Sequence, residues 1–264
     1  MRDDGTSNSI SGERSRRFGS NSGRRTVEKL IYPLWASSAG DALRDRLLTD
    51  IIPALRACEG TRAVRLTVAD SAVAAAAAKR VERLPPAPDA VLSLWLDNGG
   101  DRARQEALLA TACDRFDCLL VTEAEPIVNR DQPAGPDGRV PGWCQVVFLE
   151  TPPRLSRAEW LEVWQGSHTR VAIDVQDNFA YRQNVVVRAF CEGERLPDAM
   201  IEEDFPAAAM TSDHAFYGAP DDAELQRRVQ AMMDSCARFI DFDRIDVLPM
   251  SEYVFGDLLT AQFG

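Results

Sequence analysis

The spacing of hydrophobic positions changes several times along this chain, and each change marks an expected element of secondary structure. Runs that are continuous or alternate with polar residues predict strands, and apolar residues at helical spacing predict helices. The first half is therefore expected to contain a strand at 29–36, a helix at 41–58, strands at 61–69 and 90–96, a helix at 102–113 and a strand at 118–128. Pro53 lies inside the first helix and should kink or shorten it.

The same order of elements returns in the second half, at an offset of about 115 residues. A strand at 144–150 is followed by Ser156 and Glu159, whose spacing predicts a capping box at the start of a helix that runs to about residue 176. The remaining elements are expected as strands at 181–190 and 199–205, a helix that opens at 221–222 and a strand at 245–255. The sequence thus predicts the order βαββαβ twice.

This repeat predicts an α+β fold of two tandem ferredoxin-like βαββαβ units. Each unit has helices on one face of its sheet, so the open faces are expected to pack sheet to sheet as an intramolecular α+β barrel around a small ligand cavity. Residues 129–142 hold three Pro and three Gly and are expected to be a linker. The expected domains are a disordered tail at 1–26, a degenerate first unit at 27–128, the linker at 129–142 and a second unit at 143–264.

Composition and charge narrow the class of protein. Hydrophobic residues make up 45% of the chain and charged residues 27%, as in globular proteins. A net charge of −11 argues against nucleic acid as a partner. No apolar run is long enough to span a membrane and no apolar signal segment opens the chain, so a cytoplasmic location without membrane association is expected. Residues 1–26 carry six Arg and a charge of +3, which indicates a solvated tail or, alternatively, one that docks on an acidic surface.

The cysteines and histidines do not favour a metal site. Six Cys occur without any C-x-x-C pair, and His168 and His214 are the only histidines. We therefore expect free thiols and no metal centre.

The stretch from Phe148 to Val187 resembles the EthD family. It contains FLETPPRLSRAEWLEVWQGSHTRVAI and then DNFAYRQNVVV, with Trp164 and His168 four residues apart and Tyr181, Gln183 and Asn184 at the opening of the next strand. The resemblance covers about 110 residues well, including FYGAPDDAEL to RFIDFDRIDVLP near the C-terminus. Two departures are Arg170, where the family often has proline, and the absence of any histidine from the first half.

The resemblance implies a cofactor-independent, oxygenase-type oxidoreductase that acts on a small hydrophobic aromatic or polyketide-like molecule. His168 would be the general base, with Tyr181 or Asn184 stabilising the resulting oxyanion. The alternatives are a lyase (dehydratase or cyclase) of the same barrel superfamily and a non-enzymatic small-molecule-binding protein. No cofactor is expected, with haem as the alternative, and the sequence leaves a homodimer open. A histidine on an apolar stripe is also compatible with a purely structural role.

Other residues are candidates for substrate contacts. Strand alternation sends Glu202 and Asp204 to one face and Glu203 to the other, so a carboxylate should meet the cavity, a partner such as Arg188, or His168. Trp164 and Phe148 are expected in the core or against the substrate. Phe216 is a candidate aromatic lid at one end of the barrel, and His214 is expected in an exposed loop.

Overall fold

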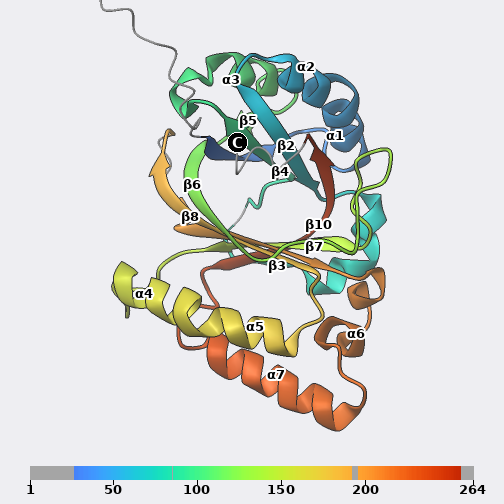
Figure 1. The fold of residues 1–264 in the computed structure, drawn as a ribbon, viewed down its shortest axis with the longest axis vertical. Helices are drawn as coiled ribbons and strands as arrows, with labels where there is room; N and C mark the ends of the chain where they lie inside the picture. The colour runs from blue at the N-terminus through green and yellow to red at the C-terminus, as the bar shows by residue number, and fades with distance from the viewer. Residues whose placement is uncertain (1–26, 85, 192–195, 257–264) are drawn as a thin grey trace, which may run out of the picture.

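The computed structural model describes residues 27–84, 86–191 and 196–256, shown in Figure 1. The predicted tail at 1–26 and residues 257–264 lie outside this range. The strands are β1 (Glu28–Trp35), β2 (Thr61–Val68), β3 (Val81–Glu82), β4 (Ala90–Leu96), β5 (Arg115–Phe116), β6 (Leu119–Ile127), β7 (Trp143–Leu149), β8 (Ala180–Ala189), β9 (Ala199–Phe205) and β10 (Ile245–Phe255).

Eight of these strands close into an antiparallel barrel. The order is β2-β4-β1-β6-β8-β9-β7-β10, and β10 pairs with β2 to complete the ring. The four barrel strands before residue 128, namely β1, β2, β4 and β6, are neighbours in this ring. The four strands after residue 142, β7 to β10, are neighbours as well. The two sets join at both edges, through β6–β8 and β10–β2, so a single chain forms the whole barrel. The predicted fold class, an intramolecular α+β barrel, is confirmed, whereas the division into domains stays a prediction.

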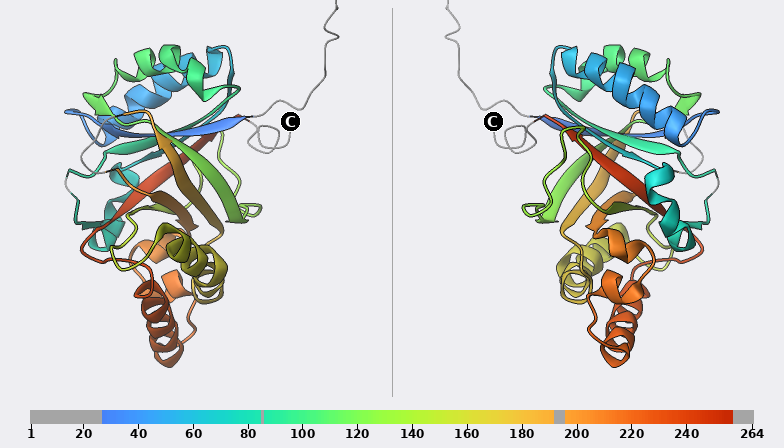
Figure 2. Two further views of the ribbon diagram at one scale, coloured as in Figure 1. Left: turned by 90° about the vertical axis from the view of Figure 1, so that its left-hand side faces the viewer. Right: turned by 90° about the vertical axis from the view of Figure 1, so that its right-hand side faces the viewer.

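Most of the helices lie outside the barrel on two opposite sides, whereas the helix at residues 71–79 lies beside the barrel, between these two layers (Figures 1 and 2). The longer helical segments are α1 (Asp41–Arg46), η1 (Leu47–Ile51) and α2 (Ile52–Ala57), η2 (Ser71–Lys79), α3 (Ala103–Leu109), α4 (Arg157–Val163), η4 (Trp164–His168) and α5 (Thr169–Val175), and α7 (Asp222–Cys236). Short turns form η3 (Gly99–Asp101), η5 (Ala207–Met210) and α6 (Asp213–Tyr217). None of the described helices combines the length and apolar character needed to cross a membrane.

A π-helical turn interrupts the first long helix of each half, as η1 and η4. Pro53 is the second residue of α2, just after η1, and has no N–H to donate to a carbonyl of the preceding turn. In η4, the hydroxyl of Thr169 donates to the carbonyl of Trp164 at 3.0 Å, and that of Ser167 donates to the carbonyl of Val163 at 2.8 Å. The backbone N–H of Thr169 also donates to the Trp164 carbonyl, so side chains and backbone together bond the carbonyls of the widened turn.

The sequence prediction and the structure agree closely for the strands and less well for short elements. The strand at 199–205 and the strand at 245–255 have the predicted bounds. The capping box of Ser156 and Glu159 is present. Helix α3 is shorter than predicted and ends at Leu109, and His214 lies on α6 rather than in a loop. The two-residue strands β3 and β5 were not predicted, since two residues carry no detectable periodicity.

Alternation along the strands divides the core into an outer and an inner part. The outer faces of the two halves pack against their helices around Leu30, Leu66 and Leu94 in the first half and Trp160, Tyr181 and Ile201 in the second. The inner face holds a separate apolar group that includes Ile31, Val146, Phe148, Met200, Leu248 and Met250. Charged side chains, together with Trp95 and Asn184, lie next to this apolar group in the barrel interior.

Candidate functional site: a charged cluster inside the barrel

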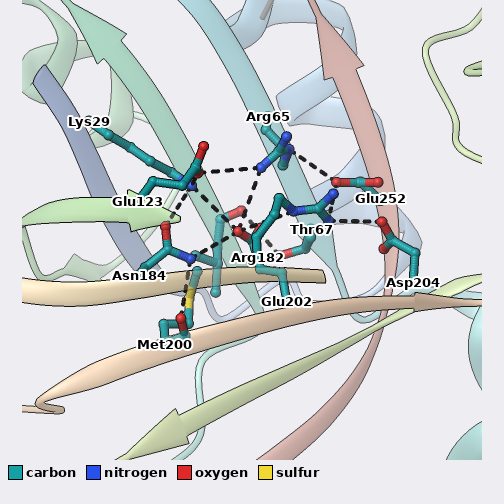
Figure 3. Close-up of polar contacts among 11 residues, drawn as sticks. Lys29, Arg65, Thr67, Glu123, Arg182, Asn184, Met200, Glu202, Asp204 and Glu252 are labelled. Carbon is teal, nitrogen blue, oxygen red and sulfur yellow. Dashed lines mark hydrogen bonds and ion pairs between the residues drawn. The ribbon is translucent and has the colours of Figure 1, made fainter. Parts of the chain in front are cut away.

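Seven ionisable side chains from six strands meet inside the barrel and form what we call the charged cluster (Figure 3). Its members are Lys29 on β1, Arg65 on β2, Glu123 on β6, Arg182 on β8, Glu202 and Asp204 on β9, and Glu252 on β10. Each side chain is at most 8% exposed. Each strand contributes the positions that face inward, so the barrel closure itself assembles the cluster.

Lys29 lies at one side of the cluster. Its ammonium donates to the carboxylate of Glu123 and to the side-chain oxygen of Asn184, the latter at 2.8 Å. It is also 3.5 Å from Glu202. Asn184 in turn donates to Glu202 at 3.1 Å, so the amide links the ammonium to a second carboxylate. Lys29 therefore has two carboxylates and one amide as partners in a buried position.

Two guanidinium groups occupy the other side. Arg182 donates to Asp204 at 2.9 Å and to Glu252 at 2.7 Å through the same nitrogen. Arg65 lies 3.1 Å from Glu252 and 3.6 Å from Glu202. Arg65 Nε and Nη1 and Arg182 Nε are buried but make no well-directed hydrogen bond to any described residue, although carboxylates are near. The cations of this side are thus held mainly by charge, with hydrogen-bonding capacity left over.

The charges of the cluster are not balanced by count, because three cations face four carboxylates. Burial opposes ionisation of Glu202, but Lys29, Arg182 and Arg65 together lower its pKa to about 2. Burial raises the pKa of Glu252 to about 8, against the attraction of Arg182 and with added repulsion from Asp204. The raised pKa distinguishes Glu252 from Glu202, and makes it the one of these two carboxyl groups that takes up a proton more readily.

The cluster has an aromatic floor, and a further carboxyl group lies beside it on β6. The indole of Trp95 lies 4.7 Å from the Lys29 ammonium and 5.2 Å from the Arg65 guanidinium, which stabilises both cations. Glu125, two residues after Glu123 on β6, is half-buried. Burial raises the pKa of Glu125, against the attraction of Arg65 and Arg182.

Of the residues predicted for the site, Asn184, Asp204 and Phe148 point into the barrel. Asn184 and Phe148 are both register partners of Met200, from the two strands that flank β9. All three predicted residues are buried, and Phe148 belongs to the apolar group next to the charged cluster. The structure thus brings together polar and apolar candidates on one face of the sheet.

The predicted base, His168, lies on the opposite face of the sheet, between the helices. Its Nδ1 is 2.9 Å from the hydroxyl of Ser235 on α7, and its ring packs 4.6 Å from that of Phe239. Burial, together with the nearby Arg238 guanidinium, lowers the pKa of His168 to about 4, so the imidazole is neutral at neutral pH. Among the described residues, no carboxylate forms a hydrogen bond or ion pair with His168.

Three other residues that were predicted to contact the substrate, Trp164, Tyr181 and Phe216, also lie outside the barrel interior. Trp164 donates its indole N–H to the hydroxyl of Tyr181 at 3.2 Å, and both side chains are fully buried under α4 and α5. Phe216 stacks on Phe205 at 4.3 Å in an apolar group with Trp143 on the outer face of β7 and β9. Phe216 therefore packs beside the barrel, and a role as a lid over its end is not supported by this position.

The carboxylate run on β9 alternates as predicted, with a different partner. Glu202 and Asp204 face the interior, and Glu203 faces outward, where it accepts hydrogen bonds from Gln145 at 3.1 Å and Asn178 at 3.2 Å. Burial raises the pKa of Glu203 to about 7. The expected partner Arg188 is exposed and lies over the ring of Phe190, so the interior carboxylates pair with Arg182 instead.

Sequence reasoning missed most of the cluster, including Lys29, Arg65, Glu123, Arg182 and Glu252. The available signal was a charged residue at an inward position of a strand whose other positions are apolar, such as Arg65 within TRAVRLTV. Such a pattern ordinarily indicates a solvated face. Only closure of the barrel turns it into a buried face.

Haem, the alternative cofactor, does not fit the surroundings of His168. Ser235 occupies Nδ1, Phe239 covers the ring, and the residue is only 5% exposed. The other histidine, His214, is an exposed residue 3.1 Å from Asp222. No group of metal-ligating side chains is present among the described residues.

Comparison with known proteins supports the fold. No family model and no curated protein matches the sequence, so the resemblance to EthD rests on its motif residues alone. The crystal structure of an anthrone oxidase-like protein is similar over 88% of this chain and 92% of that one, with a TM-score of 0.50 and 11% identity.

Two weaker matches are a protein from Lactobacillus acidophilus NCFM provisionally described as a monooxygenase and a mutant chlorite dismutase from Candidatus Nitrospira defluvii. Their TM-scores are 0.44 and 0.43, with 9% and 8% identity. They cover 88% and 89% of this chain and 96% and 93% of their own. Neither TM-score is high enough to support an inference about this chain. At 11% identity, the anthrone oxidase-like protein shows that this chain shares its α+β barrel fold.

Proposed function

We propose that this chain is a cofactor-independent oxidoreductase that acts on a small aromatic or polyketide-like molecule, with the charged cluster at the reacting end of the substrate. The observation that carries the proposal is a buried cluster of three cations and four carboxyl groups, in which burial raises the pKa of Glu252. Burying several ions costs free energy, and an apolar filling would usually be at least as stable. Strongly shifted pKa values in such a place are typical of sites that move protons.

The chemistry begins with removal of an acidic C–H or O–H proton by the carboxylate form of Glu252. Because the pKa of Glu252 is raised, the fraction of this group that is ionised increases with pH in a range above that of an ordinary carboxyl group. The enolate or phenolate oxygen that remains would be stabilised by Lys29 and Arg65, whose donors are already oriented toward the cluster. Dioxygen would then accept electrons from this anion. Phe148 and the apolar group beside the cluster supply a surface for the hydrophobic part of the substrate.

His168 is the alternative base, as the resemblance to EthD implies. A neutral imidazole suits that role, but the imidazole is enclosed between Ser235 and Phe239. Asn184 and Asp204, which also belong to the predicted site, lie on the other face of the sheet. We therefore favour the cluster.

The test is oxygen consumption by the purified full chain with a panel of small phenols and aromatic ketones. We expect turnover that rises with pH through an apparent pKa of about 8, with loss of this rise in Glu252→Gln. Turnover without oxygen uptake would instead identify a lyase, and binding without turnover would identify a binding protein. A pH profile unchanged by Glu252→Gln would contradict the assignment of the base.

A further inference from the structure

A surface groove lies near the start of β1, at the end of β4. It has a volume of about 310 Å³ and is lined by Glu59, Gly60, Leu96, Asp97, Asn98, Asp101, Arg104 and Gln105. Trp95, the residue before Leu96, is the floor of the charged cluster. Because Trp95 and Leu96 are consecutive residues of β4, the groove lies next to the end of the barrel that holds the cluster.

The groove is acidic, with three carboxylates and one guanidinium among its lining residues. Part of this charge has a local structural role. Asn98 caps η3 by accepting a hydrogen bond from the N–H of Gly100 at 2.9 Å, and it donates to Asp101 at 2.9 Å. Asp97 forms an ion pair with Arg62. These contacts do not involve Glu59, which is exposed.

Gln105 is a second, independent indication of a ligand. The residue is only 2% exposed, yet it lines the groove. Its amide nitrogen donates to the hydroxyl of Thr61 at 3.2 Å, whereas its carbonyl oxygen has no hydrogen-bond partner among the described residues. A buried acceptor without a donor costs free energy, and a ligand that donates to it would recover that cost. An acceptor among carboxylates selects a cationic donor.

The chain itself carries such donors close to the groove. Residues 1–26 contain six Arg, two of which are Arg24 and Arg25. Glu28 pairs in register with Leu96 of the groove, and its carboxylate accepts a hydrogen bond from the N–H of Gly99 at 2.6 Å. Three residues span at most roughly 10 Å, so Arg25 is attached within reach of the groove. A guanidinium also presents five donors in a planar fork, which suits carboxylates and an amide carbonyl together.

We propose that this groove is a guanidinium-binding site whose ligand is the arginine-rich segment 14–25 of the same chain. Attachment beside the groove makes the interaction intramolecular, so that weak contacts suffice. Charge complementarity supports this occupant, since the segment belongs to the +3 end of a chain whose remainder carries −14.

The proposal is tested by the rate at which trypsin cleaves after Arg14, Arg16, Arg17, Arg24 and Arg25 in the full chain, followed by mass spectrometry. Bound arginines are protected from the protease. The double variant Glu59→Gln, Asp101→Asn removes two exposed carboxylates of the groove and should raise cleavage about tenfold. Gln105→Leu should raise it by a smaller factor. High salt should remove the difference between wild type and double variant.

The matched control is Glu162→Gln, Asp234→Asn, which removes the same charge from α4 and α7 on the other side of the barrel. It should leave the cleavage rate at the wild-type value. Equal rates for wild type, groove variant and control would overturn the proposal. Equal acceleration by the groove variant and the control would also overturn it, because overall charge would then explain the effect.

Discussion

The protein buries polar groups in two places, and it does so in opposite ways. Between the helices, His168 and Ser235 form a neutral pair covered by Phe239. Inside the barrel, three cations and four carboxylates share one enclosed space. The Ser235 hydroxyl of the first pair also accepts a hydrogen bond from Arg238 at 3.0 Å. The charged cluster contains a carboxyl group with a raised pKa, Glu252, and Arg65 donors without well-directed partners, so it is the place where a bound molecule could exchange a proton or accept hydrogen bonds.

Loss of the Glu252 carboxyl group should produce the largest effect on turnover. Glu252→Gln is expected to lower kcat by roughly 10²–10⁴-fold, the usual contribution of a general base. Glu203→Gln is the matched control, because Glu203 is also buried but lies on the outer face of β9. The assay is steady-state oxygen uptake. If His168→Ala abolishes turnover while Glu252→Gln preserves it, the comparison between the two sites is reversed.

Removal of a central cation tests whether the cluster is as tightly coupled as its geometry indicates. Arg182→Met leaves Asp204 and Glu252 buried without their shared donor, and we expect a loss of about 3–5 kcal/mol in the free energy of unfolding. Urea denaturation measures this change. The control Arg170→Met breaks an exposed pair with Asp174 and should cost less than about 0.5 kcal/mol. Similar losses in the two variants would mean that the cluster is not strongly coupled.

The pH dependence of the free energy of unfolding tests the surroundings of His168, the second of the two sites compared above. The pKa of His168 is lowered to about 4 in the folded state. Between pH 6.5 and 4 the unfolded chain therefore binds a proton on this residue that the folded chain does not bind. Stability from the neutral imidazole is present above pH 6.5 and is lost as the pH falls, by about 3 kcal/mol at pH 4. Denaturation of wild type and His168→Gln at both pH values should show this difference. Equal pH slopes would place His168 in a solvated or charge-paired setting.

The smallest effect is expected from Ser235→Ala. This change removes the hydrogen bonds of the Ser235 hydroxyl with His168 and Arg238 and should destabilise the protein by about 1–2 kcal/mol, with turnover within twofold of wild type. Thermal unfolding and the oxygen-uptake assay measure the two quantities. A large fall in turnover at unchanged stability would show that the histidine pair takes part in catalysis.

Local patterns were sufficient to predict the strands and the capped helix, because their signals lie within a few neighbouring residues. The bounds of β9 and the cap at Ser156 follow from alternation and from one side chain bonding to one backbone group. The site was harder, because Lys29 and Glu202 are 173 residues apart and meet only after barrel closure. Likewise, the resemblance to EthD implied that His168 is a catalytic base, whereas its place on an apolar stripe was also compatible with a structural role. Periodicity shows that such a residue is buried but does not show which neighbour buries it.

Closure of the barrel by one chain has a consequence for how its interior can change during evolution. In a barrel assembled from two identical chains, every inward position would occur twice, and any substitution would alter both copies. Here the two halves carry different residues at their inward positions, since β4 carries Ser93 and Trp95 whereas β9 carries Glu202 and Asp204. Selection can therefore adjust one charge at a time, and laboratory evolution of a new specificity would have the same freedom.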